Sequence, residues 1–271
     1  MKAGLVVAGP DMTDGPLALL SGSFDERVRK AAALGYSGLE LMVRTPAKLD
    51  APSVKHTVAS AGLTIPQIVT GELFAADGLC LVHGDPDLRQ RSRERVFGVI
   101  DLAVSLGAMV NIGRLRGQLR LLGDVADPWG VALEHLQPVF QHAAQRGVRL
   151  TLEPLNRYET DFIHTAAEAM RLIDTSGFAN VGVMLDTFHM NIEECSFGEA
   201  LRAARDRLWH IHIADSNRHY PGSGHIDFPS IFRRLDSMGY QGFVSAELLP
   251  LPDPDTAAAE TMKYLRPFLS L

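Results

Sequence analysis

The apolar residues of the chain recur in one arrangement, in which an amphipathic helix ends at a glycine and a short apolar strand follows. The glycines at these joints are Gly35, Gly62, Gly107, Gly147, Gly177 and Gly239. Glycine adopts the left-handed conformation just past a helix without steric cost, so each one predicts a helix-to-strand connection. The interval between Gly177 and Gly239 is longer than the others, and it holds a further strand that follows Asp206 and Arg207.

This pattern predicts eight strands, each followed by a helix. The expected strands are Ala3–Ala8, Gly38–Val43, Leu63–Thr70, Ala108–Ile112, Val148–Glu153, Asn180–Asp186, Leu208–Ala214 and Gly242–Glu247. The expected helices are Asp25–Leu34, Pro52–Ala61, Asp87–Leu106, Pro128–Gln145, Thr165–Ser176, Phe197–Ala204, Pro229–Met238 and Asp255–Leu269. Such a series is typical of an α/β protein with a (β/α)8 TIM barrel, and we expect residues 1–271 to form one domain. A doubly wound parallel sheet is the weaker alternative.

Composition narrows the class of protein. Apolar residues make up 46% of the chain, which is ample for a full core. The net charge is −6 and no basic block is visible, so we do not expect nucleic acid as a partner. The apolar start is shorter than a signal peptide, and no apolar run approaches the ~20 residues of a membrane span. Two cysteines, Cys80 and Cys195, form no metal or disulfide framework, which favours a reducing cytoplasm.

Apolar and imidazole side chains alternate along the predicted strand Leu208–Ala214. The two faces are expected to carry Trp209, Ile211 and Ile213 on one side, and His210, His212 and Ala214 on the other. A polar, glycine-containing loop that includes Asp215 and Arg218 follows this strand, so the segment is predicted to form the wall of a site. Taken alone, the strand is better explained by histidines that are buried and satisfied within the core.

The neighbouring strands change that interpretation. Active sites of such barrels lie at the carboxyl ends of the strands, and the last inward residues of four successive strands are Glu153, Asp186, His212 and Glu247. A single strand-end acid is equally well explained by hydrogen bonds to loop amides. Three carboxylates together repel one another, and a divalent cation relieves that repulsion. Oxygen ligands with one imidazole favour Mn2+, Mg2+ or Co2+ over a structural zinc site.

Four long motifs carry a resemblance to a known family. They are LEPLNRYET (residues 152–160), VGVMLDTFHMNIEE (181–194), HIHIADSNRHYPGSGHIDF (210–228) and FVSAELLP (243–250). The chain resembles the ketose 3-epimerase branch of the xylose-isomerase-like TIM barrels, which includes D-tagatose and D-psicose 3-epimerases. Within this branch it is most similar to 5-keto-L-gluconate epimerases, which share LNRYETDFI, DTFHMNIEE and the ADSNR loop. The resemblance covers nearly the whole chain.

The resemblance implies an activity and a set of site residues. A metal-dependent sugar epimerase is expected, acting on a ketose or a keto-sugar acid, with one divalent metal per chain, commonly Mn2+. The implied metal ligands are Glu153, Asp186, His212 and Glu247, with Glu153 and Glu247 also acting as the acid/base pair. The implied substrate-binding residues are Glu159, His189 and Arg218. Relatives are often homodimers or homotetramers.

The chemistry agrees with these roles. Inverting a carbon beside a ketone needs one base to remove a proton from one face and a second group to return a proton to the other, while the metal stabilises the enediolate. Aldose–ketose isomerisation, as in a hydroxypyruvate or sugar isomerase, uses much the same residues and remains open. An endonuclease IV-like phosphodiesterase and a non-catalytic sugar-binding protein are more remote alternatives. Glu159 can also be a solvated loop acid, and Arg218 can instead pair with Asp215.

The segment after the fourth strand, GRLRGQLR, contains three arginines near the expected barrel mouth. They are Arg114, Arg116 and Arg120. A cation there would bind the carboxylate of a sugar acid, whereas a neutral hexose has no need of one. We therefore expect a keto-sugar acid as the physiological substrate, with neutral ketohexoses also accepted. The alternative is that these arginines are solvated or contact another subunit.

Overall fold

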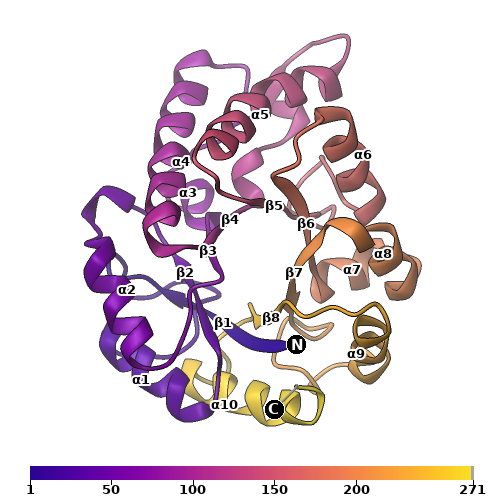
Figure 1. The fold of residues 1–271 in the computed structure, drawn as a ribbon. Helices are drawn as coiled ribbons and strands as arrows, with labels where there is room; N and C mark the ends of the chain where they lie inside the picture. The colour runs from indigo at the N-terminus through magenta and orange to yellow at the C-terminus, as the bar shows by residue number, and fades with distance from the viewer. Residues whose placement is uncertain (270–271) are drawn as a thin grey trace.

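The computed structural model describes residues 1–269 and forms a closed barrel of parallel strands surrounded by helices (Figure 1). Each strand pairs with the next in chain order, and the first pairs with the last to close the ring. The strands are β1 (Lys2–Ala8), β2 (Gly38–Met42), β3 (Gln67–Val69), β4 (Met109–Ile112), β5 (Leu150–Leu152), β6 (Val181–Asp186), β7 (Leu208–Ile213) and β8 (Phe243–Ala246). The predicted TIM barrel is confirmed.

Helices follow each strand and form the outer layer of the barrel. They are α1 (Phe24–Leu34), α2 (Ala51–Ser60), α3 (Gly71–Ala75), α4 (Pro86–Leu106), α5 (Pro128–Gln145), α6 (Ala166–Ser176), α7 (Thr187–Glu193), α8 (Phe197–Ala203), α9 (Phe228–Ser237) and α10 (Pro254–Leu265). Helices α1, α4 and α6 end at Gly35, Gly107 and Gly177 in the left-handed conformation, as predicted.

Two boundaries differ from the prediction by four residues, and proline explains both. The third strand was expected over Leu63–Thr70, but its ladder is confined to β3, and Thr64 makes only an isolated bridge to Gly38. Pro66 has no amide hydrogen to donate to a continuous ladder. The last helix was expected to reach Leu269, but it ends at Leu265 and a short 3-10 turn follows. The turn contains Pro267, which has no amide hydrogen to continue the hydrogen-bond ladder of the helix.

The sequence did not predict α3 and α7, which both begin directly after a strand at the barrel mouth. Helix α7 starts because the side chain of Asp186 accepts a hydrogen bond from the amide of Phe188, at 2.8 Å. A short acceptor at this position satisfies one of the free amides of a helix start. The chain after β6 therefore stays close to the mouth of the barrel.

The predicted position of Trp209 is wrong. The register between β6 and β7 shifts so that Val183 faces Leu208 while Met184 faces His210, which leaves one extra residue in β7. The indole ring of Trp209 occupies the space where a side chain on Gly182 would lie, and the Arg149 guanidinium stands 5.2 Å from its ring centroid. A bulge of this kind interrupts the alternation of a strand, so Trp209 does not share the face of Ile211 and Ile213.

The barrel interior is polar below the mouth, whereas the main apolar core fills the space between strands and helices. The buried polar side chains of the interior include Glu40, Gln67, Asn111, Thr151, His210 and Ser245. Space here is tight, because a Cβ added to Gly4 would lie 2.3 Å from the Ser245 hydroxyl. This polar layer forms the floor beneath the strand ends.

Contacts between the first and last units support the closure of the barrel. The Tyr36 hydroxyl donates to the carbonyl of Ala258 at 2.8 Å, and Lys30 forms an ion pair with Asp255 at 2.8 Å. In Figure 1, α1 and α10 lie on the same side of the ring, next to β1.

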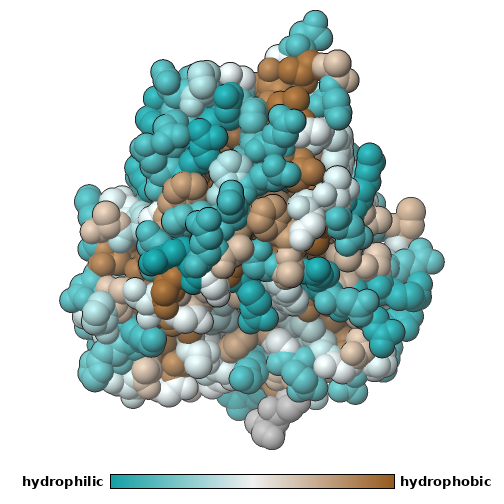
Figure 2. All heavy atoms as spheres, turned by 45° about the horizontal axis from the view of Figure 1, so that its top comes forward, coloured by the Kyte–Doolittle hydropathy of each residue, from teal (hydrophilic) through white to brown (hydrophobic). Residues whose placement is uncertain are grey.

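The outer surface is mainly hydrophilic, and in the view of Figure 2 hydrophobic residues appear as separate spots. Large apolar residues that are exposed in the described part of the chain are Val104, Tyr158 and Leu251. No helix within residues 1–269 combines the length and the apolar character needed to cross a membrane.

Candidate active site

Four side chains predicted from the sequence meet at the barrel mouth. Glu153, Asp186, His212 and Glu247 each bring one ligand atom into a group in which these atoms all lie within 4.8 Å of one another. They come from the ends of β5, β6, β7 and β8. Glu153 is 5% exposed, Asp186 1% and His212 0%. The structure therefore brings together the four strand-end residues that alternation placed inward.

The atoms that face the centre of this group lack protein partners. Glu153 Oε1, Asp186 Oδ2 and His212 Nδ1 are buried and make no hydrogen bond within the described residues. Leaving such atoms unsatisfied is costly, and here all three converge on the same point. Two buried carboxylate oxygens, an imidazole nitrogen and the adjacent Glu247 carboxylate form the donor set of a divalent cation site. The residues present thus fit one divalent metal ion.

The remaining atoms of these side chains are held in place. The Asn111 amide donates to Glu153 Oε2 at 3.2 Å, and the capping contact with Phe188 holds Asp186 Oδ1. His212 Nε2 lies 2.9 Å from Glu40 Oε2. Glu153, Asp186 and His212 therefore each have one fixed end and one end that is available at the centre.

The electrostatics of the four side chains also favour a bound cation. Burial raises the pKa of Glu153 to about 8, and the nearby Glu247 carboxylate adds to the effect. Burial likewise raises the pKa of Asp186 to about 6, although the Arg218 charge partly opposes it. For Glu247, burial is outweighed by His212 and Arg218, which lower its pKa. The protein alone therefore resists ionising all three carboxylates together, and a cation would remove that resistance.

His189 lies beside this group on α7. Its Nε2 is 3.7 Å from Asp186 Oδ2 and 3.9 Å from Glu153 Oε1, and this nitrogen has no hydrogen-bond partner among residues 1–269. The other ring nitrogen, Nδ1, contacts the side-chain amide of Asn156 at 2.8 Å. Burial and the positive charge of Arg218 lower the pKa of His189 well below its usual value, so the ring is neutral.

Asn156 fixes which nitrogen of His189 carries the proton. Its Oδ1 accepts from the amide of Tyr158, so its NH2 group faces both Glu159 and His189. His189 Nδ1 must then accept, and the ring hydrogen sits on Nε2. The histidine offers a neutral donor to the pocket. Sequence reasoning missed Asn156, although it lies in the LNRYET motif.

Arg218 and Glu159 meet across the mouth. Arg218 Nη1 lies 2.9 Å from Glu159 Oε1, and Arg218 Nη2 lies 3.9 Å from Glu247 Oε2. Arg218 also has a left-handed backbone, with φ of 61°. The Asp215 carboxylate instead accepts from the backbone amides of its own loop, including that of Gly222 at 2.8 Å. The Arg218 guanidinium therefore points to the site and does not pair with the Asp215 carboxylate.

The three arginines after β4 have different surroundings. Arg114 lines the pocket, with its Nε 3.8 Å from Glu159 Oε2. Arg120 is exposed. Arg116 is fully buried, and its guanidinium donates to the main-chain carbonyls of four residues, namely Gly113, Glu153, Phe162 and Ile163. The expectation that Arg116 faces a substrate is wrong, because carbonyl oxygens of the loops use its donors.

The pocket between these residues has a volume of about 250 Å³. Its polar wall contains Asn111, Arg114, Glu153, Glu159, His189, Arg218 and Glu247. Its apolar wall includes Leu17, Met42 and Val69 from the opposite side of the mouth. A polar wall facing an apolar one is typical of a site for a small polar molecule.

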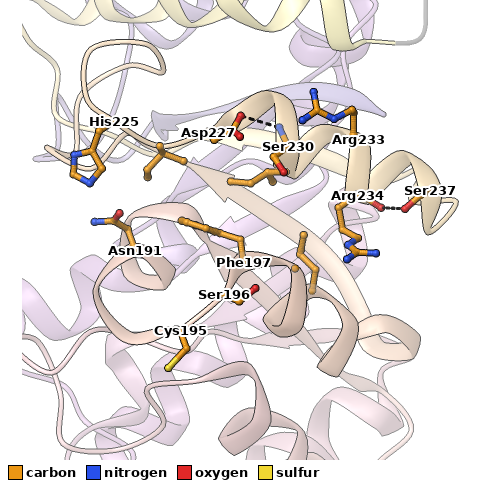
Figure 3. Close-up of a pocket in the computed structure, with 14 residues that line it drawn as sticks. Asn191, Cys195, Ser196, Phe197, His225, Asp227, Ser230, Arg233, Arg234 and Ser237 are labelled. Atoms are coloured by element: carbon orange, nitrogen blue, oxygen red, sulfur yellow. Dashed lines mark hydrogen bonds between the residues drawn. The ribbon is translucent and has the colours of Figure 1, made fainter.

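A larger hollow, of about 630 Å³, lies on the outside of the barrel between α8 and α9 (Figure 3). It contains none of the predicted site residues. Its labelled side chains include Cys195, His225 and Arg233, and its drawn hydrogen bonds are local contacts such as that of Asp227 with Ser230. Size alone therefore does not identify the active site, whereas the converging unsatisfied atoms do.

Comparisons with known proteins agree with the geometry. Residues 28–268 match the profile of the family described as Xylose isomerase-like TIM barrel. The chain is 32% identical over 219 residues to an L-ribulose 3-epimerase of Mesorhizobium japonicum, covering 79% of this chain and 71% of the relative. A solved structure of an L-ribulose 3-epimerase matches with a TM-score of 0.82 at 26% identity, covering 99% of this chain and 94% of that one. Hydroxypyruvate isomerase of Escherichia coli is 26% identical over 260 residues, covering 93% of this chain and 97% of the relative.

The chain belongs to the xylose isomerase-like TIM barrel family. Its similarity to ketose 3-epimerases in both sequence and structure places it with the sugar epimerases of the isomerase class, which confirms the resemblance found in the motifs. The more particular likeness to 5-keto-L-gluconate epimerases stays a prediction.

Proposed function

We propose that the protein inverts the carbon next to the ketone of a ketose or keto-sugar acid, as a metal-dependent 3-epimerase. The observation that carries this proposal is the pair Glu153 and Glu247, which reach one pocket from β5 and β8. Two strands, β6 and β7, separate them around the ring. Two carboxylates that approach from different directions can serve opposite faces of one substrate carbon.

Glu153, Asp186, His212 and Glu247 would hold one divalent ion, for which Mn2+ is our first choice and Mg2+ or Co2+ the alternatives. When bound, this ion would supply positive charge near the oxygens that become negative as the C–H bond breaks. Oxygen-rich ligation with one imidazole supports this choice of metals.

The two proposed acid/base residues have pKa values shifted in opposite directions. Burial and the Glu247 charge raise the pKa of Glu153, while the His212 and Arg218 charges lower that of Glu247. In the metal-free protein, Glu153 therefore tends to hold a proton and Glu247 tends to be ionised. Two carboxyl groups in such different environments are suited to different roles in proton transfer.

Glu159, His189 and Arg218 would orient the substrate. The neutral His189 offers its Nε2 hydrogen, and Arg218 offers a charged donor beside Glu247. Glu159, held by Arg218 and Asn156, offers acceptors for hydroxyl groups. Such fixed contacts reduce the freedom of a bound sugar and place its reacting carbon between the two acids.

The proposed substrate is a keto-sugar acid, with neutral ketohexoses as poorer substrates. The support is Arg114, a partly exposed cation that lines the pocket. A substrate carboxylate would gain a charge-assisted contact there. We further propose a homodimer or homotetramer, and a cytoplasmic location that suits the free thiols Cys80 and Cys195.

The proposal is tested with a panel of ketoses and keto-acids incubated with Mn2+ in deuterated water and followed by NMR. Inversion with deuterium at the carbon beside the ketone supports a 3-epimerase. Aldose–ketose isomerisation is the second candidate, favoured by the similarity to hydroxypyruvate isomerase over most of both chains. Aldose formation without inversion would establish that candidate instead.

A further inference from the structure

A buried carboxylate that the proposed reaction does not use lies directly beneath the site. Glu40, from the middle of β2, contacts two histidines of β7 at once. Its Oε1 lies 2.5 Å from His210 Nε2, and its Oε2 lies 2.9 Å from His212 Nε2. All three side chains are 0–1% exposed. A charge this deep persists only when strong hydrogen bonds compensate it.

The contacts of Glu40 define the orientation of both imidazoles. Glu40 Oε2 accepts from the Gln67 amide, and each of its two oxygens lies within hydrogen-bond distance of one imidazole Nε2. A carboxylate with these contacts offers only acceptors, so each histidine presents an Nε2–H to it. For His212 this leaves Nδ1 as the atom that faces Glu153, Asp186 and Glu247.

We propose that Glu40 is a positioning residue, which fixes His212 with its Nε2 hydrogen below the site and its Nδ1 available as a metal ligand. This inference rests on the proposed metal site but not on which sugar reaction the protein catalyses. A carboxylate that accepts from the far nitrogen of a ligating histidine fixes the ring and makes the near nitrogen a better ligand.

A further chain of hydrogen bonds holds Glu40 in this role. The Thr151 hydroxyl donates to Gln67 Oε1 at 2.6 Å, so the Gln67 amide NH2 points the other way, to Glu40 Oε2 at 3.1 Å. Glu40 thus accepts from three donors that come from β3 and β7. A neutral amide in its place would turn its own NH2 group toward at least one of them.

Without Glu40, His212 has a competing arrangement. Its Nδ1 is 3.3 Å from Glu247 Oε2, which is close enough for an Nδ1–H to donate there after a small shift. That bond would place a hydrogen on His212 Nδ1 and engage Glu247 Oε2. Both atoms are proposed to bind the ion. Glu40 therefore keeps both ligands available by accepting the Nε2 hydrogen of His212.

The first test compares the affinity of the full chain for Co2+, measured by competition with a chromophoric chelator, without any substrate. Glu40→Gln and Glu40→Leu should each bind Co2+ about 10- to 100-fold more weakly, the range expected for outer partners of a ligating histidine. Tyr36→Phe is the matched control, because it removes one buried hydrogen bond far from the site and should leave affinity unchanged. Wild-type affinity in a folded Glu40→Gln variant would overturn the proposal.

The second test needs no variant to fold. Long-range 1H–15N spectra of the metal-free wild-type protein report which nitrogen of each histidine is protonated. We expect Nε2 of both His210 and His212 to carry a hydrogen with a strongly downfield resonance. A spectrum in which His212 Nε2 is unprotonated would contradict the role of Glu40. If these results hold while no ketose reacts, the epimerase proposal fails and this inference stands.

Discussion

Asp186 and His189 are joined by a single hydrogen-bonded turn. Asp186 Oδ1 accepts from the Phe188 amide at 2.8 Å and starts α7, while Asp186 Oδ2 lies 3.7 Å from His189 Nε2. One oxygen of this carboxylate thus builds the helix that carries His189, and the other faces the centre of the site. The two functions can be separated by substitution, because an asparagine keeps the first and loses the charge of the second.

Asp186→Asn should therefore fold and fail to bind metal. The asparagine oxygen still caps α7, so the free energy of unfolding of the metal-free protein should change by less than about 1 kcal/mol. Loss of an anionic ligand should lower Mn2+ affinity and turnover by about 100-fold or more. Calorimetric titration with Mn2+ and thermal unfolding measure the two effects, and normal Mn2+ affinity in this variant would contradict the proposed ligand set.

Removing the metal should abolish activity reversibly. Treatment with EDTA should inactivate the enzyme, and Mn2+ or Co2+ should restore it, because three carboxylates and an imidazole converge with unsatisfied atoms. Turnover is measured after readdition of each metal, with elemental analysis giving the metal content. Full activity in a sample verified to be free of metal would exclude the proposed role.

The metal-free protein should lose stability as the pH rises from about 5 to 8. The folded-state pKa of Glu153 is about 8, above its usual 4.5, so its contribution is present below 4.5 and lost as pH rises through 8. The raised pKa of His212 acts in the same direction. The thermal midpoint in EDTA should thus fall over this range, and Glu153→Gln should show a smaller fall. An equal fall in both proteins would show that Glu153 is not responsible.

Each proposed acid/base residue should be needed for exchange. Glu153→Gln and Glu247→Gln should lower kcat by roughly 100- to 10,000-fold, as expected for a general acid or base. Incorporation of solvent deuterium into substrate during turnover measures the two proton transfers separately. Product formed by the wild type without any solvent deuterium would favour a hydride shift, or a proton shuttle shielded from solvent.

Arg114 should decide the preference for charged substrates. Arg114→Gln should lower kcat/KM for 5-keto-L-gluconate and D-tagaturonate by about tenfold or more while changing that for D-fructose and D-allulose little. Arg120→Gln is the matched control, because Arg120 is exposed. If neutral sugars are better wild-type substrates and Arg114→Gln preserves that order, the carboxylate proposal is wrong. Arg116 is unsuitable for this test, since removing its buried guanidinium orphans several carbonyls.

The strand ends of the second half of the barrel could be predicted because alternation there is regular. Glu153, Asp186 and Glu247 each end an apolar strand in phase with the inward residue before it. Alternation gave the wrong face for Trp209, because a bulge adds one residue to β7 and nothing in the sequence marks that extra residue. It also gave no orientation for Arg114 and Arg116, since their segment forms 3-10 turns with no repeating pattern.

The sequence contains an indication that Glu40 is important, which our interpretation did not use. It is the one acid within the apolar strand GLELM, between Leu39 and Leu41. A charged residue flanked by buried positions must find partners inside the fold. Those partners, His210 and His212, lie 170 and 172 residues further along the chain, so only the closed barrel reveals them.

The pairing of β1 with β8 determines at which stage of synthesis and folding the site can form. Glu247 follows β8 directly, and the ring stays open until that last strand takes its place beside the first. During synthesis, Glu40 and β1 emerge from the ribosome long before the residues they must meet. The four proposed metal ligands therefore come together only after β8 has been made and has paired with β1.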